Sequence, residues 1–300
     1  MHDALAGILR CPVGCDTQLE LDGEVNGGEV RTGTLHCRGC GREYRIEDGI
    51  ARMLPDDLRL EQTPDRSTVP PPIQGKELIP EHETAKEATV RKRSEMRARD
   101  AQVEDYDRMW YLSLFGKVET PLTLSHLSLE RTHLLLEAGC GTGRMTRAFA
   151  ARCERLVSAD FSWESLRACS RKLRQSGVTN VDLIQADICQ LPLRSNAFDR
   201  VASCQVLEHI PTPESRATAV EELSRVLKDS GRLVLSAYQY SLLTRLFGEK
   251  EGQHEGGIYF YRFARQELQA LLSRTLEVEA ITGAMVYHYI ARCRKHERRL

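Results

Sequence analysis

Short apolar runs and amphipathic stretches alternate through the second half of the chain. Five runs rich in apolar residues predict strands at 134–136, 155–159, 181–186, 198–204 and 232–236. Apolar residues at helical spacing predict helices between them, at 144–153, 162–175, 266–272, and from 212 to a point before Gly231. Two further β-like runs, near 276–281 and 284–290, close the chain. This alternation predicts an α/β fold, with a doubly wound, mostly parallel seven-stranded sheet between layers of helices.

The first half of the chain has a different pattern, which predicts three further regions. Residues 1–54 combine glycine, cysteine and short β-like stretches, as in a small separate module. Prolines recur between 55 and 80 among few large apolar residues, which predicts an extended linker. Residues 81–132 predict a leading helical segment, and 133–300 form the α/β domain. Acidic and basic residues interleave at 81–107, which favours a solvated helix face over the alternative of an RNA-binding stripe.

Composition and charge narrow the possible partners. The chain has 300 residues, a net charge of −1 and a pI of about 6.8. It therefore has no overall bias toward polyanions, and RNA binding would need a local patch. No apolar stretch approaches the ~20 residues that span a bilayer, and no apolar leader begins the chain. We expect a cytoplasmic protein without membrane contact, whose ten cysteines are thiols or metal ligands rather than disulfides.

The first predicted strand runs into a glycine loop. Glu137 ends the apolar run, and Gly139, Gly141 and Gly143 follow at alternate positions, so a ligand could approach the main chain there. A dinucleotide fingerprint would need a further glycine where Arg144 stands. The loop therefore favours a ligand without a pyrophosphate.

Acidic residues end the next two predicted strands. Asp160 lies 23 residues after Glu137, a distance that suits hydrogen bonding to ribose hydroxyls. Asp187 ends the third strand, where a carboxylate can accept a hydrogen bond from an exocyclic amine. Ile188 and Phe161 would then be apolar walls for a purine. Carboxylates at three successive strand ends, beside a glycine loop, indicate a nucleoside site.

These motifs together resemble the class I S-adenosylmethionine-dependent methyltransferases, of the type 11-like group, over about residues 134–290. Ser230 departs from the pattern, because a second glycine is usual there. The segments that carry the resemblance are Leu136–Arg144 (LEAGCGTGR), Val157–Ser162 (VSADFS), Ala186–Pro192 (ADICQLP), Ala197–His209 (AFDRVASCQVLEH) and Arg225–Leu235 (RVLKDSGRLVL).

The resemblance implies a Rossmann-like fold, S-adenosylmethionine as cofactor, and roles for particular residues. Glu137 would lie near the amino-acid end of the cofactor, beside the backbones of the three glycines. Asp160 would hold the ribose, and Asp187 with Ile188 would frame the adenine. Gln205 would face the cofactor after the fourth strand. An aromatic cluster at 106–111, which includes Tyr106, either folds over the cofactor or packs as part of a leading helix.

Methyl transfer from a sulfonium needs positioning, and it needs a base only when the acceptor must lose a proton. His209 is the candidate base, because the loop after the fourth strand borders the methyl group in similar enzymes; the alternative is a packing or capping role. The Asn/Asp-Pro-Pro-Tyr/Phe motif of amine methylation is absent after this strand. Cys204 lacks a neighbouring proline, which disfavours a cytosine-C5 enzyme.

The acceptor is less constrained by the sequence. Aromatic residues between Tyr238 and Phe263 suit a planar or apolar acceptor, or ordinary packing. The neutral net charge favours a small molecule over RNA, although a basic tail (Arg292, Arg294, Lys295, Arg298 and Arg299) keeps RNA as an alternative. A non-catalytic protein that uses the cofactor domain as a scaffold is the third possibility. The intact acidic and glycine positions argue against it.

Two cysteine pairs at the N-terminus predict a metal site. Cys11, Cys15, Cys37 and Cys40 have the spacing of a tetrahedral structural zinc site, and His36 is an alternative ligand. A segment of this size has too little core to fold well alone, so bound zinc would stabilise it. Residues 43–54 resemble the end of the small zinc-ribbon proteins that activate tRNA, rRNA and release-factor methyltransferases. The resemblance implies a module for stabilisation or docking. Four thiolate ligands would close the site, which disfavours catalysis at zinc.

Overall fold

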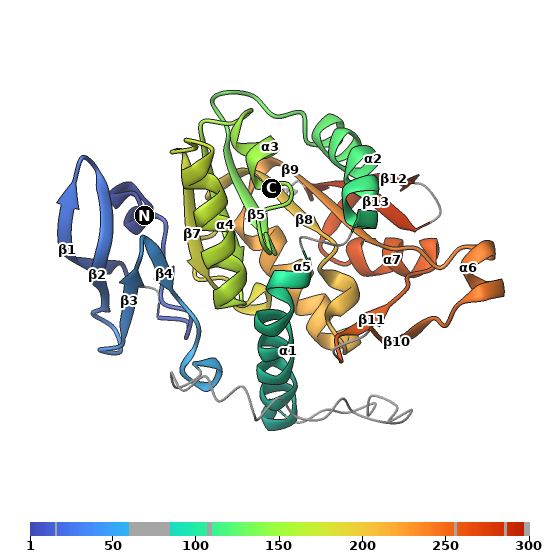
Figure 1. Cartoon of the computed structure of the whole chain (residues 1–300), viewed down its shortest axis with the longest axis horizontal. Coiled ribbons are helices and arrows are strands. Elements are labelled where there is room, and N and C mark those ends of the chain that lie inside the picture. The colour runs from blue at the N-terminus through green and yellow to red at the C-terminus, as the bar shows by residue number, and fades with distance from the viewer. Residues whose placement is uncertain (16, 60–84, 107–109, 255–256, 285–286, 297–300) are drawn as a thin grey trace.

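The computed structural model describes residues 1–15, 17–59, 85–106, 110–254, 257–284 and 287–296 (Figure 1). Within these residues no helix is both long enough and apolar enough to cross a membrane.

Seven neighbouring strands of one sheet have the spatial order β7-β6-β5-β8-β9-β13-β12, with β12 at the edge. The parallel strands are β5 (Leu134–Ala138), β6 (Arg155–Asp160), β7 (Val181–Gln185), β8 (Phe198–Cys204) and β9 (Leu227–Tyr238). The last pair, β12 (Leu276–Ala284) and β13 (His288–Lys295), is antiparallel and joins the sheet through β9. The predicted α/β doubly wound fold is therefore confirmed. Strand order reverses beside β5, which places a ligand crevice at the carboxyl ends of β5 and β8.

Both faces of the central sheet are buried, because its strands carry apolar residues at successive positions. Leu135 packs on one side with Phe149, whereas Leu136 packs on the other side with Val220. The first face is covered by α2 (Trp110–Leu127), α3 (Thr146–Ala150) and α4 (Trp163–Gln175). The second face is covered by α5 (Pro213–Val226) and α7 (Arg265–Leu272).

Three predicted boundaries were wrong. The helix predicted at 144–153 is confined to α3, because the turn of the glycine loop continues through Met145 and the helix ends at Ala150, where another turn follows. Gly231 lies inside β9 and does not follow a helix, since β9 already begins at Leu227. The last strand is β13 at 288–295 rather than 284–290. Its position is fixed by pairing with β12, in which Arg294 Nε lies 3.0 Å from Glu277 Oε2.

This pairing also changes the interpretation of the basic tail. Arg292 Nε lies 2.9 Å from Glu279 Oε2, and Lys295 Nζ lies 3.5 Å from Asp229 Oδ1. These two cations and Arg294 therefore stabilise the edge of the sheet. Arg298 and Arg299 lie outside the described residues.

The N-terminal module continues the same sheet. Its strands are β1 (Leu19–Asn26), β2 (Glu29–Cys37), β3 (Glu43–Glu47) and β4 (Ile50–Arg52), and short 3₁₀ helices lie at Asp3–Gly7 and Asp56–Leu58. β4 pairs in parallel with β7, with Ala51 opposite Ile184. The His2 backbone N–H donates to Asp182 Oδ1 at 2.6 Å. The sheet thus has eleven strands, a long-range extension that local patterns along the chain could not predict.

The segment after β4 leads to α1 (Ala85–Tyr106). Leu58 is buried with Leu54 and with Met96 of α1, and Phe161 packs against this cluster. The predicted linker thus begins with an ordered turn at 55–59, and its remainder lies outside the described residues. The domain boundaries at 54, 80 and 132 stay predictions.

Candidate functional site

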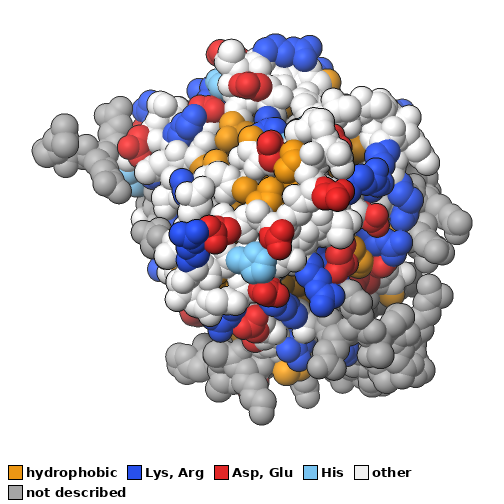
Figure 2. Space-filling model, turned by 90° about the vertical axis from the view of Figure 1, so that its left-hand side faces the viewer, with side chains coloured by type: hydrophobic (Ala, Val, Ile, Leu, Met, Phe, Trp, Pro, Cys, Tyr) orange, Lys and Arg blue, Asp and Glu red, His pale blue; other side chains and the backbone are white. Residues whose placement is uncertain are grey.

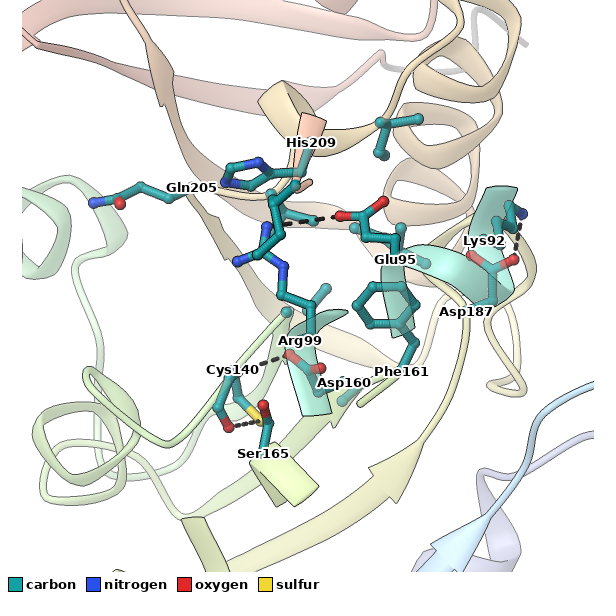
Figure 3. Close-up of a pocket in the computed structure, with 18 of the residues that line it drawn as sticks. Lys92, Glu95, Arg99, Cys140, Asp160, Phe161, Ser165, Asp187, Gln205 and His209 are labelled. Carbon is teal, nitrogen blue, oxygen red and sulfur yellow. Dashed lines mark hydrogen bonds and ion pairs between the residues drawn. The ribbon is translucent and has the colours of Figure 1, made fainter. Parts of the chain in front are cut away.

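A cavity of about 490 Å³ lies at the carboxyl ends of β5, β6, β7 and β8 (Figure 3). Its lining brings together nine residues that the sequence singled out: Glu137, Gly139, Gly141, Asp160, Phe161, Asp187, Ile188, Gln205 and His209. Gly143 does not line the cavity, and the side chain of Tyr106 lies outside the described part of the structure. The residues that separate motifs predicted for binding ribose, for binding a purine and for accepting a proton therefore line the same cavity.

The glycine loop is tied to β6 through its backbone. The N–H groups of Gly139 and Cys140 both donate to the carbonyl of Ala159, at 2.7 and 3.0 Å. Gly139 has a φ of +84°, and a Cβ there would lie 2.2 Å from Val206 Cγ2. At Gly143 a Cβ would lie 2.7 Å from Cys169 Sγ. These two positions therefore need glycine for conformation and for space.

Glu137 is buried beneath the loop. Its Oε2 accepts hydrogen bonds from Thr146 Oγ1 at 2.7 Å and Ser158 Oγ at 2.8 Å. Burial raises the pKa of Glu137 to about 7, although the hydrogen bonds from the two hydroxyls lower it in part. A positively charged ligand group beside this carboxyl would favour its ionised form.

Asp160 links the loop to the start of α4. Its Oδ2 accepts from the Gly141 N–H at 2.7 Å, and its Oδ1 accepts from the Ser162 N–H at 2.9 Å. Burial raises the pKa of Asp160, although the hydrogen bonds from these backbone N–H groups lower it in part. Each carboxylate oxygen keeps a further lone pair, so the group can still accept from a ligand hydroxyl.

Asp187 is also engaged at both oxygens. Oδ1 accepts from the Cys189 N–H at 2.9 Å, and Oδ2 lies 2.5 Å from Lys92 Nζ. An exocyclic amine bound here would have to share Oδ2 with Lys92 or displace it.

Residues of α1 that the sequence did not single out also line the cavity. One face of the helix forms a wall of the cavity through Lys92, Glu95 and Arg99, so the prediction of a solvated helix is wrong for this face. Glu95 Oε1 lies 3.6 Å from Arg99 Nη2, and burial raises the pKa of Glu95 to about 7. The face carries charges where a buried helix normally carries apolar residues, which explains why no apolar stripe identified it.

His209 lies at the far end of the cavity. Its Nδ1 lies 2.7 Å from the carbonyl oxygen of Tyr259. A carbonyl can only accept a hydrogen bond, so Nδ1 carries the proton and Nε2 is an acceptor. Burial lowers the pKa of His209 well below its ordinary value, and the nearby charge of Arg99 acts in the same direction. The imidazole is therefore neutral at physiological pH.

Aromatic groups surround His209. Its ring centroid lies 5.6 Å from that of Tyr238 and 6.1 Å from that of His254. Both neighbours line the cavity, together with Ile258. Tyr238 and His254 are thus the residues of the aromatic insert that lie beside His209. Tyr261 and Phe263 instead make an edge-to-face contact with each other, and the guanidinium of Arg216 lies over both rings.

Gln205 is held by a residue of α2. The backbone at Gln205 has a φ of +58°, which is unusual for a residue with a side chain. Its Nε2 donates to Glu119 Oε2 at 2.6 Å, and Figure 3 shows the amide pointing away from the centre of the cavity. Glu119 is buried and also binds Arg144 Nη1 at 2.8 Å and Ser236 Oγ at 2.5 Å. A lone glutamate in an apolar helix gave no signal of this role.

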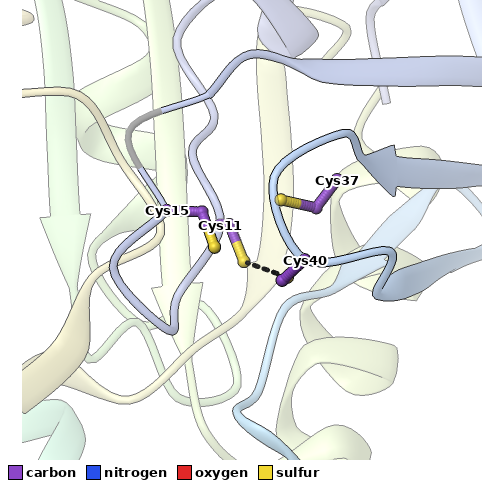
Figure 4. Close-up of side chains that lie close together, drawn as sticks. All are labelled: Cys11, Cys15, Cys37 and Cys40. Carbon is purple, nitrogen blue, oxygen red and sulfur yellow. Dashed lines mark hydrogen bonds between the residues drawn. The ribbon is translucent and has the colours of Figure 1, made fainter.

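The four N-terminal cysteines converge (Figure 4). Their sulfur atoms all lie within 4.8 Å of one another, and those of Cys11 and Cys40 are 3.7 Å apart. Tyr44 Oη lies 3.1 Å from Cys11 Sγ, and Thr17 Oγ1 lies 3.3 Å from Cys37 Sγ. His36 instead lies 3.3 Å from Glu43 and is not in the cluster.

Comparison with known proteins supports one family. A family model described as "Methyltransferase domain" matches residues 136–235. A demethylmenaquinone methyltransferase from Clavibacter sepedonicus is 31% identical over 44% of this chain and 48% of the relative. A tRNA (carboxymethyluridine(34)-5-O)-methyltransferase from Arabidopsis thaliana is 31% identical over 39% of this chain and 28% of the relative. The chain thus spans about half or less of these curated relatives.

Solved structures show the same fold. The 1,6-didemethyltoxoflavin-N1-methyltransferase of Burkholderia thailandensis, solved with 1,6-didemethyltoxoflavin and S-adenosylhomocysteine, aligns with a TM-score of 0.57 at 17% identity. The alignment covers 72% of this chain and 92% of that one.

Replacing single glycines of the loop by alanine should distinguish the cost of a steric clash from the cost of a positive φ angle. Gly143→Ala should lower the free energy of unfolding by about 2–4 kcal/mol, because the new Cβ meets Cys169 and φ is positive. Gly141→Ala is the matched control: its φ is also positive, but the position that its Cβ would take has no atom of a non-neighbouring residue within 4 Å. We expect it to cost about 1 kcal/mol. Equal losses in chemical denaturation would contradict this account of the loop.

Proposed function

We propose that this chain contains a class I S-adenosylmethionine-dependent methyltransferase domain and that the protein transfers a methyl group from S-adenosylmethionine to a small planar molecule. One observation carries the proposal: a single cavity joins the acidic strand ends Asp160 and Asp187 to the neutral imidazole of His209. Asp160 and Asp187 suit the binding of a nucleoside, and His209 can accept a proton.

We assign the donor end of the cavity to the nucleoside and amino acid. Asp160 would accept hydrogen bonds from the ribose hydroxyls, and Asp187 would accept from the adenine amine, with Lys92 moved aside. Phe161 and Ile188 would contact the purine. Glu137 and the backbones at Gly139 and Gly141 would lie along the amino-acid part, with Gln205 beside it. Gly143, which does not line the cavity, would act only by keeping the conformation of the loop. A role for Tyr106 stays a prediction from the sequence.

His209 would act as general base. Bound S-adenosylmethionine supplies a methyl group on a positive sulfur; the acceptor lone pair forms the new bond as the carbon–sulfur bond breaks and its electron pair returns to sulfur. His209 Nε2 would receive the acceptor's proton, since Nδ1–H is fixed on Tyr259. A neutral imidazole is needed for this step, and burial supplies it.

Three observations favour a small molecule over RNA. The far end of the cavity lies among Tyr238, His254 and Ile258, beneath α1. The described cations of the basic tail are paired within the sheet. Figure 2 shows acidic and basic side chains interspersed on the face of the N-terminal module. Arg42 Nε, for example, lies 2.6 Å from Asp56 Oδ2. Methylation of tRNA, as named for the Arabidopsis relative, remains the second candidate function.

The cysteine cluster fits a structural zinc ion. Zinc–sulfur bonds of ~2.3 Å in a tetrahedron place the sulfurs about 3.8 Å apart, close to the 3.7 Å between Cys11 and Cys40. Four cysteine ligands leave no open position, so zinc would supply cross-linking of the module rather than catalysis. We propose that Cys11, Cys15, Cys37 and Cys40 hold it.

The enzymatic proposal predicts release of S-adenosylhomocysteine from S-adenosylmethionine when the protein meets the small-molecule fraction of a cell extract. His209→Gln should lower kcat about 10²–10⁴-fold if the acceptor must lose a proton. His126 does not line the cavity, so the control variant His126→Gln should have the kcat of wild type. In a pH profile of kcat for wild type, the loss of activity toward acid should occur below the ordinary pKa range of histidine, because the lowered pKa keeps His209 neutral until the pH falls further. Product formed only with the RNA fraction would favour the second candidate.

The zinc proposal predicts stoichiometric zinc in the purified protein by elemental analysis. Cys37→Ser should lose the metal and unfold the N-terminal module at lower temperature, because a ligand of the cluster is gone. Cys153→Ser, a buried cysteine elsewhere in the chain, should keep the zinc. Equal metal content in both variants, or none in wild type, would contradict the assignment.

A further inference from the structure

Arg99 places a positive charge in the middle of the cavity. Its side chain reaches from α1 toward His209 in Figure 3. Its charge acts on groups at both ends of the cavity. It favours the ionised form of Asp160. Burial is the main cause of the lowered pKa of His209 and of His254, and the charge of Arg99 is the second cause. The guanidinium therefore stands between the donor end and the acceptor end.

The contacts of Arg99 leave part of its guanidinium for a ligand. Among the described residues its charged partner is Glu95, one helical turn earlier, at 3.6 Å. A guanidinium carries five N–H donors in a planar fork, and one partner at that distance does not engage all of them. Glu95 is itself held on the same helix, so the pair does not fix Arg99 to the body of the protein.

Apart from Glu95, the groups around the acceptor end bring little opposite charge, since burial raises the pKa of Glu208 well above its ordinary value and favours its neutral form. His209 and His254 are neutral because burial lowers the pKa of each. Tyr238 and Ile258 add aromatic and apolar surface. If the proposed function is correct, the donor also brings a positive sulfur to this region. An acceptor that carries an oxyanion would then place a negative charge beside the guanidinium and the sulfonium.

We propose that Arg99 binds an ionised oxygen of the acceptor, and that it selects planar acceptors with an acidic hydroxyl, such as phenols and enols. This inference rests on the proposed function and specifies its substrate class. The hydroxyl proton leaves to His209 Nε2, the oxyanion pairs with the guanidinium, and a lone pair of the acceptor forms the bond to the methyl carbon. The carbon–sulfur bond breaks with its electron pair on sulfur, so the charges of oxyanion and sulfonium are both removed.

A pair of probes tests the inference without turnover. The full-length protein is saturated with S-adenosylhomocysteine and titrated with 4-nitrophenol at a pH where it is ionised, and with 4-nitroanisole, its uncharged ether. Wild type should bind the phenolate at least about tenfold more tightly than the ether. Arg99→Met should bind both within about twofold, whereas Arg97→Met, an exposed arginine on the same helix, should keep the wild-type preference. Equal binding of the two probes by wild type, or binding of neither, overturns the proposal even if Arg99→Met does not fold.

A second titration distinguishes the acceptor from the donor's own carboxylate. S-adenosylhomocysteine carries that carboxylate and 5′-methylthioadenosine lacks it. If Arg99 serves the acceptor, Arg99→Met should change the affinity of both by less than about threefold. A loss of about tenfold for S-adenosylhomocysteine alone would assign the guanidinium to the donor and overturn the proposal. Failure of wild type to bind S-adenosylhomocysteine would instead refute the proposed function itself.

Discussion

The site depends on the attachment of the glycine loop to the end of β6. Asp160 accepts from Gly141, and the carbonyl of Ala159 accepts from Gly139 and Cys140, so three loop N–H groups are bound by two consecutive residues. Without these bonds a loop of glycines would have many conformations. With them, the backbone stays against the strand ends and leaves the space in which a ligand can lie.

Buried charge gives this space its chemistry. Glu137, Glu95 and Asp160 are carboxyl groups whose pKa is raised because burial removes water. Each would gain from a ligand that brings hydroxyls or positive charge. The same lack of water keeps His209 neutral and leaves Arg99 as the positive group at the acceptor end. Donor and acceptor preferences thus follow from one cause, the covering of the strand ends by α1.

α1 is itself held by the N-terminal module. Leu54 and Leu58 pack with Met96, and Arg93 Nε donates to the carbonyl of Asp57 at 2.6 Å. On the sheet side, β4 pairs with β7, and Gln185 of β7 donates through Nε2 to the carbonyl of Phe161 at 3.0 Å. The module and the turn that follows it therefore contact α1 and β7, and they support the cavity without lining it.

The sequence predicted the parts of the site that depend on local patterns. Strand ends at Glu137, Asp160 and Asp187 were found because apolar runs stop there, and the glycines because their spacing is distinctive. The roles of Lys92, Arg99 and Glu119 could not be predicted, since charged residues on a helix usually face solvent. The pairing of β4 with β7 was also beyond local patterns, because it joins residues more than a hundred positions apart.

Calorimetric titration with S-adenosylhomocysteine tests the central claim most directly, because that claim is a nucleoside site at the strand ends. Wild type should bind, and Asp160→Asn should weaken binding about 10- to 100-fold, since a ribose hydroxyl loses its charged acceptor. Asp229→Asn, at an exposed carboxylate on β9, should bind like wild type. Absence of binding by wild type, or equal affinity of all three proteins, would contradict the account.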